Sequence, residues 1–185
     1  MPGVTGVSEP MQALYEGDRE RAERLLAERD EIDVFEAAAF GRAERLRDLL
    51  DSDSGRAKAF SPDGFTALHF SAFFSHPDTA ALLLERGADA SARARNAMEV
   101  EPLHSAAAAD QTEISRLLLA AGADPNARQE GGFVPLHAAA QNGNAELVAL
   151  LLGHGADPAL ESDDGKTAAS IAREAGHEQL ADSLA

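Results

Sequence analysis

The chain of 185 residues contains no cysteine and no tryptophan, and one tyrosine with eight phenylalanines makes up an aromatic content of only 5%. Without cysteine the chain forms neither a disulfide framework nor a thiolate nucleophile. This composition fits a reducing compartment, and we expect a cytoplasmic protein. Because aromatic side chains are so few, their positions carry much of the information about what the surface contacts.

Basic charge and long apolar runs are also scarce. Sixteen Lys and Arg residues face 32 Asp and Glu residues, which gives a net charge of -16 and a pI near 4.6. A phosphate backbone or an anionic membrane surface requires a basic face, so we expect neither a nucleic acid nor a membrane as partner. No uninterrupted apolar run approaches the roughly 20 residues of a membrane-spanning helix. The first ten residues, MPGVTGVSEP, lack the basic and apolar regions of a secretory signal.

Apolar residues nevertheless make up 44% of the chain, which is typical of a folded protein. The length suits one domain with a substantial core, and two domains are not expected. We therefore predict a flexible N-terminal tail at residues 1–10 and a single domain at residues 11–185.

The dominant feature is an internal repeat. His69, His104 and His137 are spaced 35 and 33 residues apart, and Ser170 follows another 33 residues on. Each histidine is followed 18 residues later by the sequence Gly-Ala-Asp. Two apolar helical stretches separated by a break lie between each histidine and the Gly-Ala-Asp that follows it. This pattern predicts a helix pair in every repeat.

Local residue chemistry supports this prediction. Pro102 and Pro135 stand at the expected first turn of a helix, where a missing N–H group is harmless. Gly87, Gly122 and Gly155 follow the second helix and suit the left-handed position that ends a helix. One helix pair cannot bury both of its faces alone, so its stability must come from stacking on neighbouring pairs.

The joint matches at a fixed period resemble the ankyrin repeat. That family begins each repeat with G-x-T-P-L-H, bends at A-A-x-x-G-H and ends with L-L-L and G-A-D-x-N-A; here DGFTALH occupies 63–69 and GGFVPLH occupies 131–137. The resemblance covers roughly residues 11–184. It implies an all-α fold with short β-hairpin or turn fingers, forming a solenoid of about six helix pairs with irregular N-terminal pairs and a polar C-terminal cap. The approximate units are 11–30 (N-terminal cap pair), 31–60 (degenerate repeat), 61–95, 96–128, 129–161 and 162–185 (C-terminal cap).

Six histidines in an acidic chain invite a metal or acid–base hypothesis. The resemblance instead implies that His69, His104 and His137 hydrogen-bond within their repeat and toward the next repeat's backbone. Thr66 supplies the usual hydroxyl partner of His69, whereas Glu101 replaces it in the next repeat, where its carboxylate is placed to pair with His104. We therefore treat the three histidines as structural anchors, together with Gly87, Gly122 and Gly155. We predict no catalytic residue, metal ligand or cofactor, and a metal- or histidine-dependent enzyme is the remote alternative.

In the ankyrin family, recognition uses the finger tips and the first-helix positions before each bend. By register these positions carry Phe65 and Phe133 on fingers, Phe73 and Phe74 in the groove, and Phe40 in the looser upstream copy. Burial of a phenylalanine stabilises a protein by roughly 1.5–3 kcal/mol, so several exposed on one face indicate an interaction site. The alternative is that Phe73 and Phe74 pack against the neighbouring finger.

The finger before His104 is irregular. It reads RARNAMEVEPLH at 93–104 and holds two more residues than the finger before His137. Met98 and Val100 are apolar where this fold normally meets solvent. The insertion either contributes to recognition or is a tolerated surface loop, since lengthening a loop costs little free energy.

We therefore expect a non-catalytic protein–protein interaction module that binds a protein or peptide through its concave face and finger tips. A homo-oligomerising scaffold that uses the same apolar patch is the alternative, whereas binding a foreign partner predicts a monomer. The predicted partner-binding residues are Phe40, Phe65, Phe73, Phe74, Met98, Val100 and Phe133.

Overall fold

The structure is a computed structural model that describes residues 6–185. Residues 1–5 of the predicted flexible tail lie outside the described residues. The first helix begins at Glu9, two residues before the predicted start of the domain, and already buries Pro10 and Met11.

Residues 6–185 form six helix pairs, and the predicted all-α fold is confirmed. Within these residues there is no β-strand, and the fingers are turns with one isolated bridge between Phe60 and Thr66. The pairs are α1 (Glu9–Tyr15) with α2 (Arg19–Ala27), α3 (Val34–Ala39) with α4 (Ala43–Ser52), α5 (Ala67–Phe73) with α6 (Pro77–Glu85), α7 (Pro102–Ala108) with α8 (Thr112–Ala120), α9 (Pro135–Asn142) with α10 (Ala145–Gly153), and α11 (Ala168–Glu174) with α12 (Glu178–Ser183). Two 3-10 helices, η1 (Ser54–Lys58) and η2 (Glu130–Gly132), lie in connections.

The helix ends follow the sequence signals. Pro102 and Pro135 are the first residues of α7 and α9. Gly87, Gly122 and Gly155 have φ angles of 81°, 91° and 90°, which is the left-handed region that glycine enters without strain. Each glycine therefore ends a second helix and turns the chain toward the next finger.

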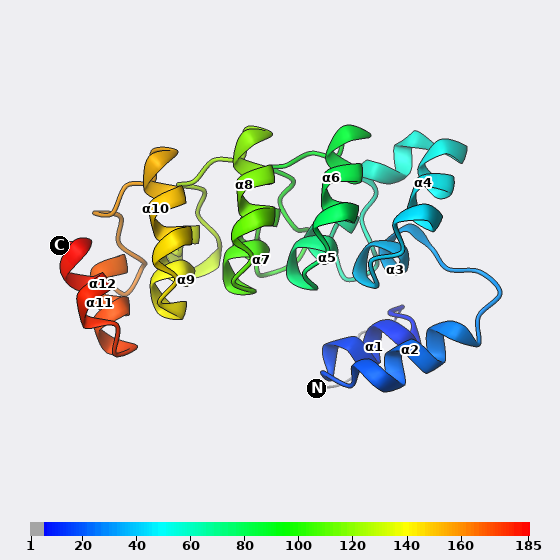
Figure 1. The fold of residues 1–185 in the computed structure, drawn as a ribbon, viewed down its shortest axis with the longest axis horizontal. Coiled ribbons are helices and arrows are strands. Elements are labelled where there is room, and N and C mark those ends of the chain that lie inside the picture. Colours follow the sequence, from blue (N-terminus) through cyan, green and yellow to red (C-terminus); the bar gives the residue numbers. More distant parts are fainter. Residues whose placement is uncertain (1–5) are drawn as a thin grey trace.

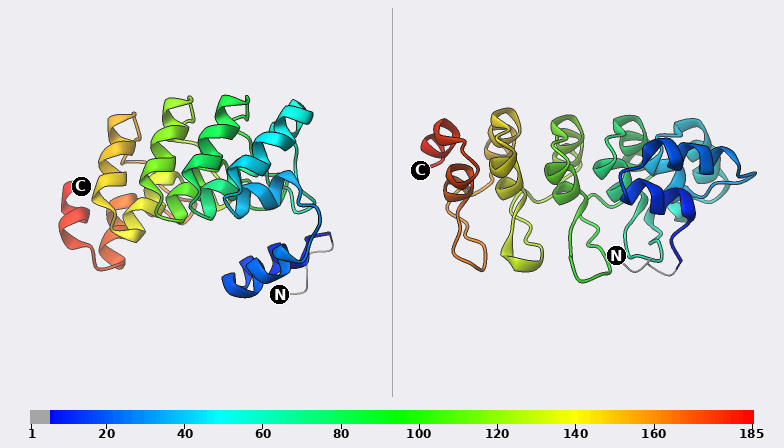
Figure 2. Two further views of the ribbon diagram at one scale, coloured as in Figure 1. Left: turned by 45° about the vertical axis from the view of Figure 1, so that its right-hand side comes forward. Right: turned by 90° about the horizontal axis from the view of Figure 1, so that it is seen from below.

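The pairs from α3–α4 to α11–α12 stack side by side. The first helices α3, α5, α7, α9 and α11 pack on one another in order, and α4, α6, α8 and α10 form a second layer (Figure 1). The fingers project together from one edge of the stack (Figure 2). Leu68, Leu103 and Leu136 occupy the same place in successive repeats and are at most 1% exposed, so each repeat buries apolar surface against its neighbours.

The N-terminal pair α1–α2 departs from this stack. The two helices lie beneath the layer of first helices, beside α3, instead of adding a further unit at the end (Figures 1 and 2). Only 24 residues separate Gly17 from Gly41, which leaves no room for a finger to position the pair as a repeat. The pair is fixed by specific contacts: Ser8 Oγ donates to Glu36 Oε1 at 2.6 Å, and Arg42 pairs with Glu23.

The structure corrects two predicted surface positions. Phe40 is only 3% exposed and belongs to the apolar core, and the N-terminal helix pair lies against the side of α3 (Figure 2). Val100 is only 5% exposed, because its carbonyl oxygen accepts a hydrogen bond from His69 and draws the finger onto α5. The prediction that these two side chains are exposed on the surface is wrong.

This correction gives a stability test with a matched control. Replacing the buried ring in Phe40→Ala leaves a cavity, and we expect urea denaturation to show a loss of about 3–5 kcal/mol. Replacing Phe73, which is 49% exposed, by Ala is expected to cost about 1 kcal/mol or less. Equal losses in the two variants would contradict the assignment of Phe40 to the core and Phe73 to the surface.

Candidate functional site

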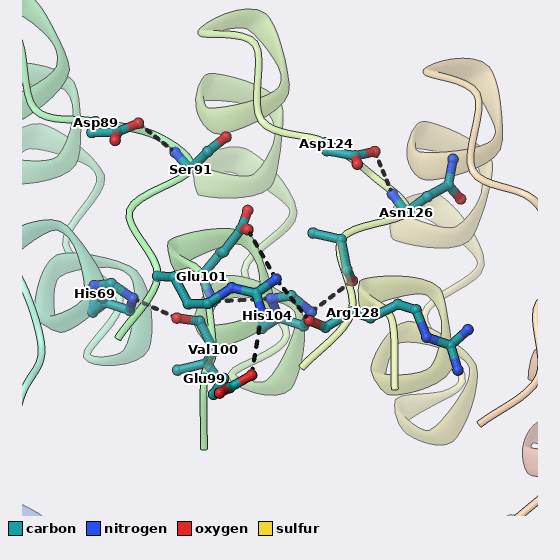
Figure 3. Close-up of polar contacts among 12 residues, drawn as sticks. His69, Asp89, Ser91, Glu99, Val100, Glu101, His104, Asp124, Asn126 and Arg128 are labelled. Atoms are coloured by element: carbon teal, nitrogen blue, oxygen red, sulfur yellow. Dashed lines mark hydrogen bonds and ion pairs between the residues drawn. The ribbon is translucent and has the colours of Figure 1, made fainter. Parts of the chain in front are cut away.

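Each anchor histidine joins its own helix to the following finger. His69 is the clearest case: its Nδ1 accepts hydrogen bonds from the backbone N–H of Thr66 at 3.2 Å and from the Thr66 hydroxyl at 2.8 Å. Its Nε2–H donates to the carbonyl oxygen of Val100 at 3.1 Å (Figure 3). The imidazole therefore closes the start of α5 and fixes the next finger at the same time.

His104 and His137 repeat this geometry without the hydroxyl. Their Nδ1 atoms accept from the backbone N–H three residues before, at 3.1 Å in both cases, and their Nε2–H groups donate to the carbonyl oxygens of Ala127 at 2.9 Å and Leu160 at 3.1 Å. Burial lowers the pKa of His69 and of His104 to about 4 and also lowers the pKa of His137. Because both ring nitrogens are occupied and the ring is neutral, no imidazole of this set is available as a proton donor or metal ligand.

Glu101 does not pair with His104 as the sequence suggested. The histidine Nδ1 already accepts the backbone N–H of Glu101, and a carboxylate has no proton to donate to it (Figure 3). The side chain is buried with Oε2 unpartnered, and Oε1 lies 4.0 Å from Arg93 Nη2. Burial raises the pKa of Glu101, whereas Arg93 lowers it.

An apolar pocket of about 330 Å³ opens on the concave side between α5 and α7. Its floor consists of Phe70, His69 and His104, and its walls come from three separate elements: Tyr15 ends α1, Phe73 ends α5, and Met98 stands on the irregular finger. These three side chains are 40%, 49% and 52% exposed and are the exposed large apolar residues of the described chain. Their convergence on one pocket makes it the candidate binding site.

Three aromatic rings that pack against one another line the pocket. The ring of Phe74 lies between those of Tyr15 and Phe73, with centroids 6.2 Å and 5.3 Å away, and the contact with Phe73 is edge-on. Phe74 is half-buried by these contacts, while Phe73 is exposed. Of the two groove phenylalanines, one therefore packs locally and the other is presented to solvent.

Comparison with known proteins assigns the chain to a family. The family profile described as Ankyrin repeats (3 copies) matches residues 11–129 and 103–185. The chain belongs to the ankyrin repeat family. Ankyrin repeats are generally protein–protein interaction modules, and the family is typically non-catalytic. Among curated protein sequences, none matches the chain.

Residues 6–185 of this ankyrin repeat chain have neither a membrane-spanning helix nor a cluster of metal-binding side chains. None of the helices there is long and apolar enough to cross a membrane. The same residues contain no group of three or more histidine and carboxylate side chains that are arranged to hold a metal ion.

The predicted partner-binding residues divide into two groups around the ankyrin groove. The pocket brings together Phe65, Phe73, Phe74, Met98 and Val100, with Val100 contributing from its buried position. It does not include Phe40, which is in the core, or Phe133, whose half-buried ring lies 5.6 Å from that of His137 in its own repeat.

The irregular ankyrin finger is well fixed. Asn96 Nδ2 donates to the carbonyl oxygen of Asp63 at 2.9 Å, and Asn96 Oδ1 accepts the N–H of Met98 at 3.0 Å. The carbonyl oxygen of Met98 accepts the N–H of Glu130 in the following finger at 3.2 Å. Through Asn96 and Met98 the longer finger is thus bonded to the finger before it and to the finger after it, and these bonds hold Met98 at the pocket.

Tyr15 is the site residue that sequence reasoning missed. Its hydroxyl donates to the Asp63 carboxylate of the first finger, and burial together with that carboxylate raises its pKa, so the hydroxyl stays protonated. The sequence signal was slight: it is the sole tyrosine and it follows the apolar residues of α1. Its place in the groove depends on how α1–α2 folds back, which repeat register does not give.

The histidine geometry predicts acid sensitivity. The folded protein binds protons on His69 and His104 less tightly than the unfolded chain, in which imidazole titrates near pH 6.5. Each ring therefore contributes stability above pH 6.5 that is lost as the pH falls toward about 4, on the order of 3 kcal/mol per ring. Urea unfolding between pH 7 and pH 4, with NMR titration of both rings, measures this. Rings that titrate near 6.5 in the folded protein would contradict it.

Proposed function

We propose that the chain is a non-catalytic protein-binding module that accepts an apolar segment of a partner protein in the concave pocket. Phe73 and Met98 act as the two exposed anchors, and Phe65, Phe70 and Phe74 form the surface behind them. The observation that carries the proposal is that all the exposed large apolar side chains of the described residues line this one pocket.

Energetics favour a binding role over chance exposure. An apolar side chain such as Phe73 or Met98 gains roughly 1.5–3 kcal/mol when it is fully buried, and here about half of each side chain faces solvent. Three such residues from α1, α5 and a finger meet in one place, and the described residues expose no other large apolar side chain. Burial of these three side chains by a partner would therefore contribute favourable free energy to binding, and exposed apolar patches of this kind commonly mark interaction sites.

Preorganisation adds to this support. Met98 is held through the hydrogen bonds of Asn96 and Glu130, and Phe73 is held edge-on against Phe74. Neither anchor therefore needs a loop to become ordered when the partner arrives. Binding sites of this kind lose less conformational entropy on association.

The acidic residues around the pocket favour a partner segment without negative charge. Three residues that line the pocket, Tyr15, Met98 and Gln129, are each followed in sequence by an exposed glutamate: Glu16, Glu99 and Glu130. Glu16 and Glu99 each pair with one arginine at the surface, an interaction that is weak in water. With a net charge of -16 for the chain, the site suits a neutral or basic partner segment and repels an acidic one.

Substitution of the two anchors tests the proposal. A partner is captured from lysate, purified and titrated by calorimetry against the wild type and the Phe73→Asp/Met98→Asp double variant. Two charges in the pocket are expected to weaken binding at least about tenfold, or about 1.4 kcal/mol, with the thermal unfolding midpoint little changed. Phe133→Ala is the control, because this aromatic side chain lies outside the pocket.

The outcomes separate the possibilities. Unchanged affinity in the folded double variant, or loss of binding in Phe133→Ala alone, would place the site elsewhere on the surface. Sedimentation at several concentrations addresses the alternative occupant: a dimer of the wild type that the double variant abolishes would assign the pocket to a second copy of this chain.

A further inference from the structure

The N-terminal helix pair closes one end of the groove. Residues Met11 and Leu14 of α1 are 5% and 9% exposed, and Met11 lines a small crevice together with Phe35 and Phe70 from α3 and α5. At the far end of α1, Tyr15 packs on Phe74 and bonds to Asp63. The helix is thus held both at the first helices and at the first finger, and its last residue is a wall of the pocket.

The opposite end of the pocket is open. On the side toward α7 and α9 the pocket is lined by Ala108, whose side chain is small and exposed. The next positions along the groove are Ala109 and the polar residues Gln141 and Asn142. A partner chain can therefore leave the pocket along the groove in this direction. It cannot continue in the other direction without meeting Tyr15.

The pocket is built for an uncharged group. Among its lining residues in the described chain there is no Asp, Glu, Lys or Arg, and its two histidines are neutral with both nitrogens engaged. Its only other polar lining side chains among the described residues are Tyr15, Ser105 and Gln129. A charged group there would lose its hydration without gaining a counterion, whereas an apolar side chain with its peptide groups near Ser105 and Gln129 meets no such cost.

The volume limits what enters. At about 330 Å³ the pocket is at the lower end of the roughly 300–1,000 Å³ that is usual for sites that enclose a compact ligand. It therefore has room for one large side chain and its adjoining backbone.

We propose, on the basis of the function proposed above, that α1 is a fixed end wall of the binding site and that Tyr15 determines which part of a partner is accepted. The pocket takes one uncharged aromatic or long aliphatic side chain at, or next to, the end of a peptide segment. The rest of the segment runs toward α7 and α9 and carries basic residues that face Glu99 and Glu130. Tyr15 is in this view a specificity-determining residue that makes the site selective for segment ends.

Peptides of identical composition test this directly. Three capped peptides contain one phenylalanine, two arginines and otherwise glycine and serine, with the phenylalanine first, in the middle or last. Each is titrated into the 15N-labelled full chain, and the amide signals of Met98, Ser105 and Gln129 are followed. We expect at least one end-placed phenylalanine to bind about fivefold or more tightly than the central one.

Variants at the wall provide the decisive comparison. Tyr15→Ala is expected to remove the preference for the end-placed phenylalanine by letting a chain pass, whereas Tyr15→Phe keeps the ring and is expected to retain it. The α1 amide signals report whether the helix stays docked during the titration.

Three results would overturn the end-wall proposal: no shift at the pocket with any peptide, equal affinity for central and end-placed phenylalanine in the wild type, or an unchanged preference in Tyr15→Ala. Release of α1 during binding would also overturn it, because the helix would then be a displaceable cover. Failure here is separable from failure of the proposed function, since loss of partner binding in Phe73→Asp/Met98→Asp does not depend on which end of a segment enters.

Discussion

Three histidines tie the first helices of the central repeats to the finger that follows each of them. The imidazole of His69 donates to the carbonyl oxygen of Val100, and His104 and His137 reach the following finger in the same way. A single helix pair cannot bury both of its faces and has only marginal stability on its own. These hydrogen bonds, and the leucines packed between the first helices, therefore stabilise the pairs as one stack. The fingers are thereby fixed at the edge of the groove, and the binding surface inherits its rigidity from the scaffold.

The candidate site arises where this regular scaffold is interrupted. A longer finger brings Met98 over the groove, α5 ends in two phenylalanines, and an N-terminal helix pair that is not a stacked repeat brings Tyr15 to the same place. Each feature alone is a local irregularity. Together they form an open apolar pocket in an acidic protein, and two of the scaffold histidines line it. The departures from the repeat thus form the pocket that we propose as the binding site, while the regular repeats position it.

Sequence alone predicts whatever depends on short-range chemistry. Pro102 at a helix start, Gly87 at a helix end and His69 as a tie all follow from residue type and spacing, and so does the exposure of Phe73. Most of the errors concern long-range contacts, whereas the one at Glu101 concerns a local contact. Repeat register places Phe40 on the groove because it assumes an open groove. Residue type alone pairs Glu101 with His104, because it leaves out the backbone N–H that the ring accepts. Tyr15 was missed because no local pattern shows where α1–α2 folds back.

The contact between Tyr15 and Phe74 tests the account most directly, since it joins the N-terminal helix pair to the groove. The chain has a single tyrosine, so its ring signals in a NOESY spectrum of the free protein are unambiguous. With ring centroids 6.2 Å apart, we expect cross-peaks between the edges of the two rings, and Phe74→Leu is expected to remove them. A folded protein without these cross-peaks, in which the amides of α1 exchange freely with solvent, would contradict the account.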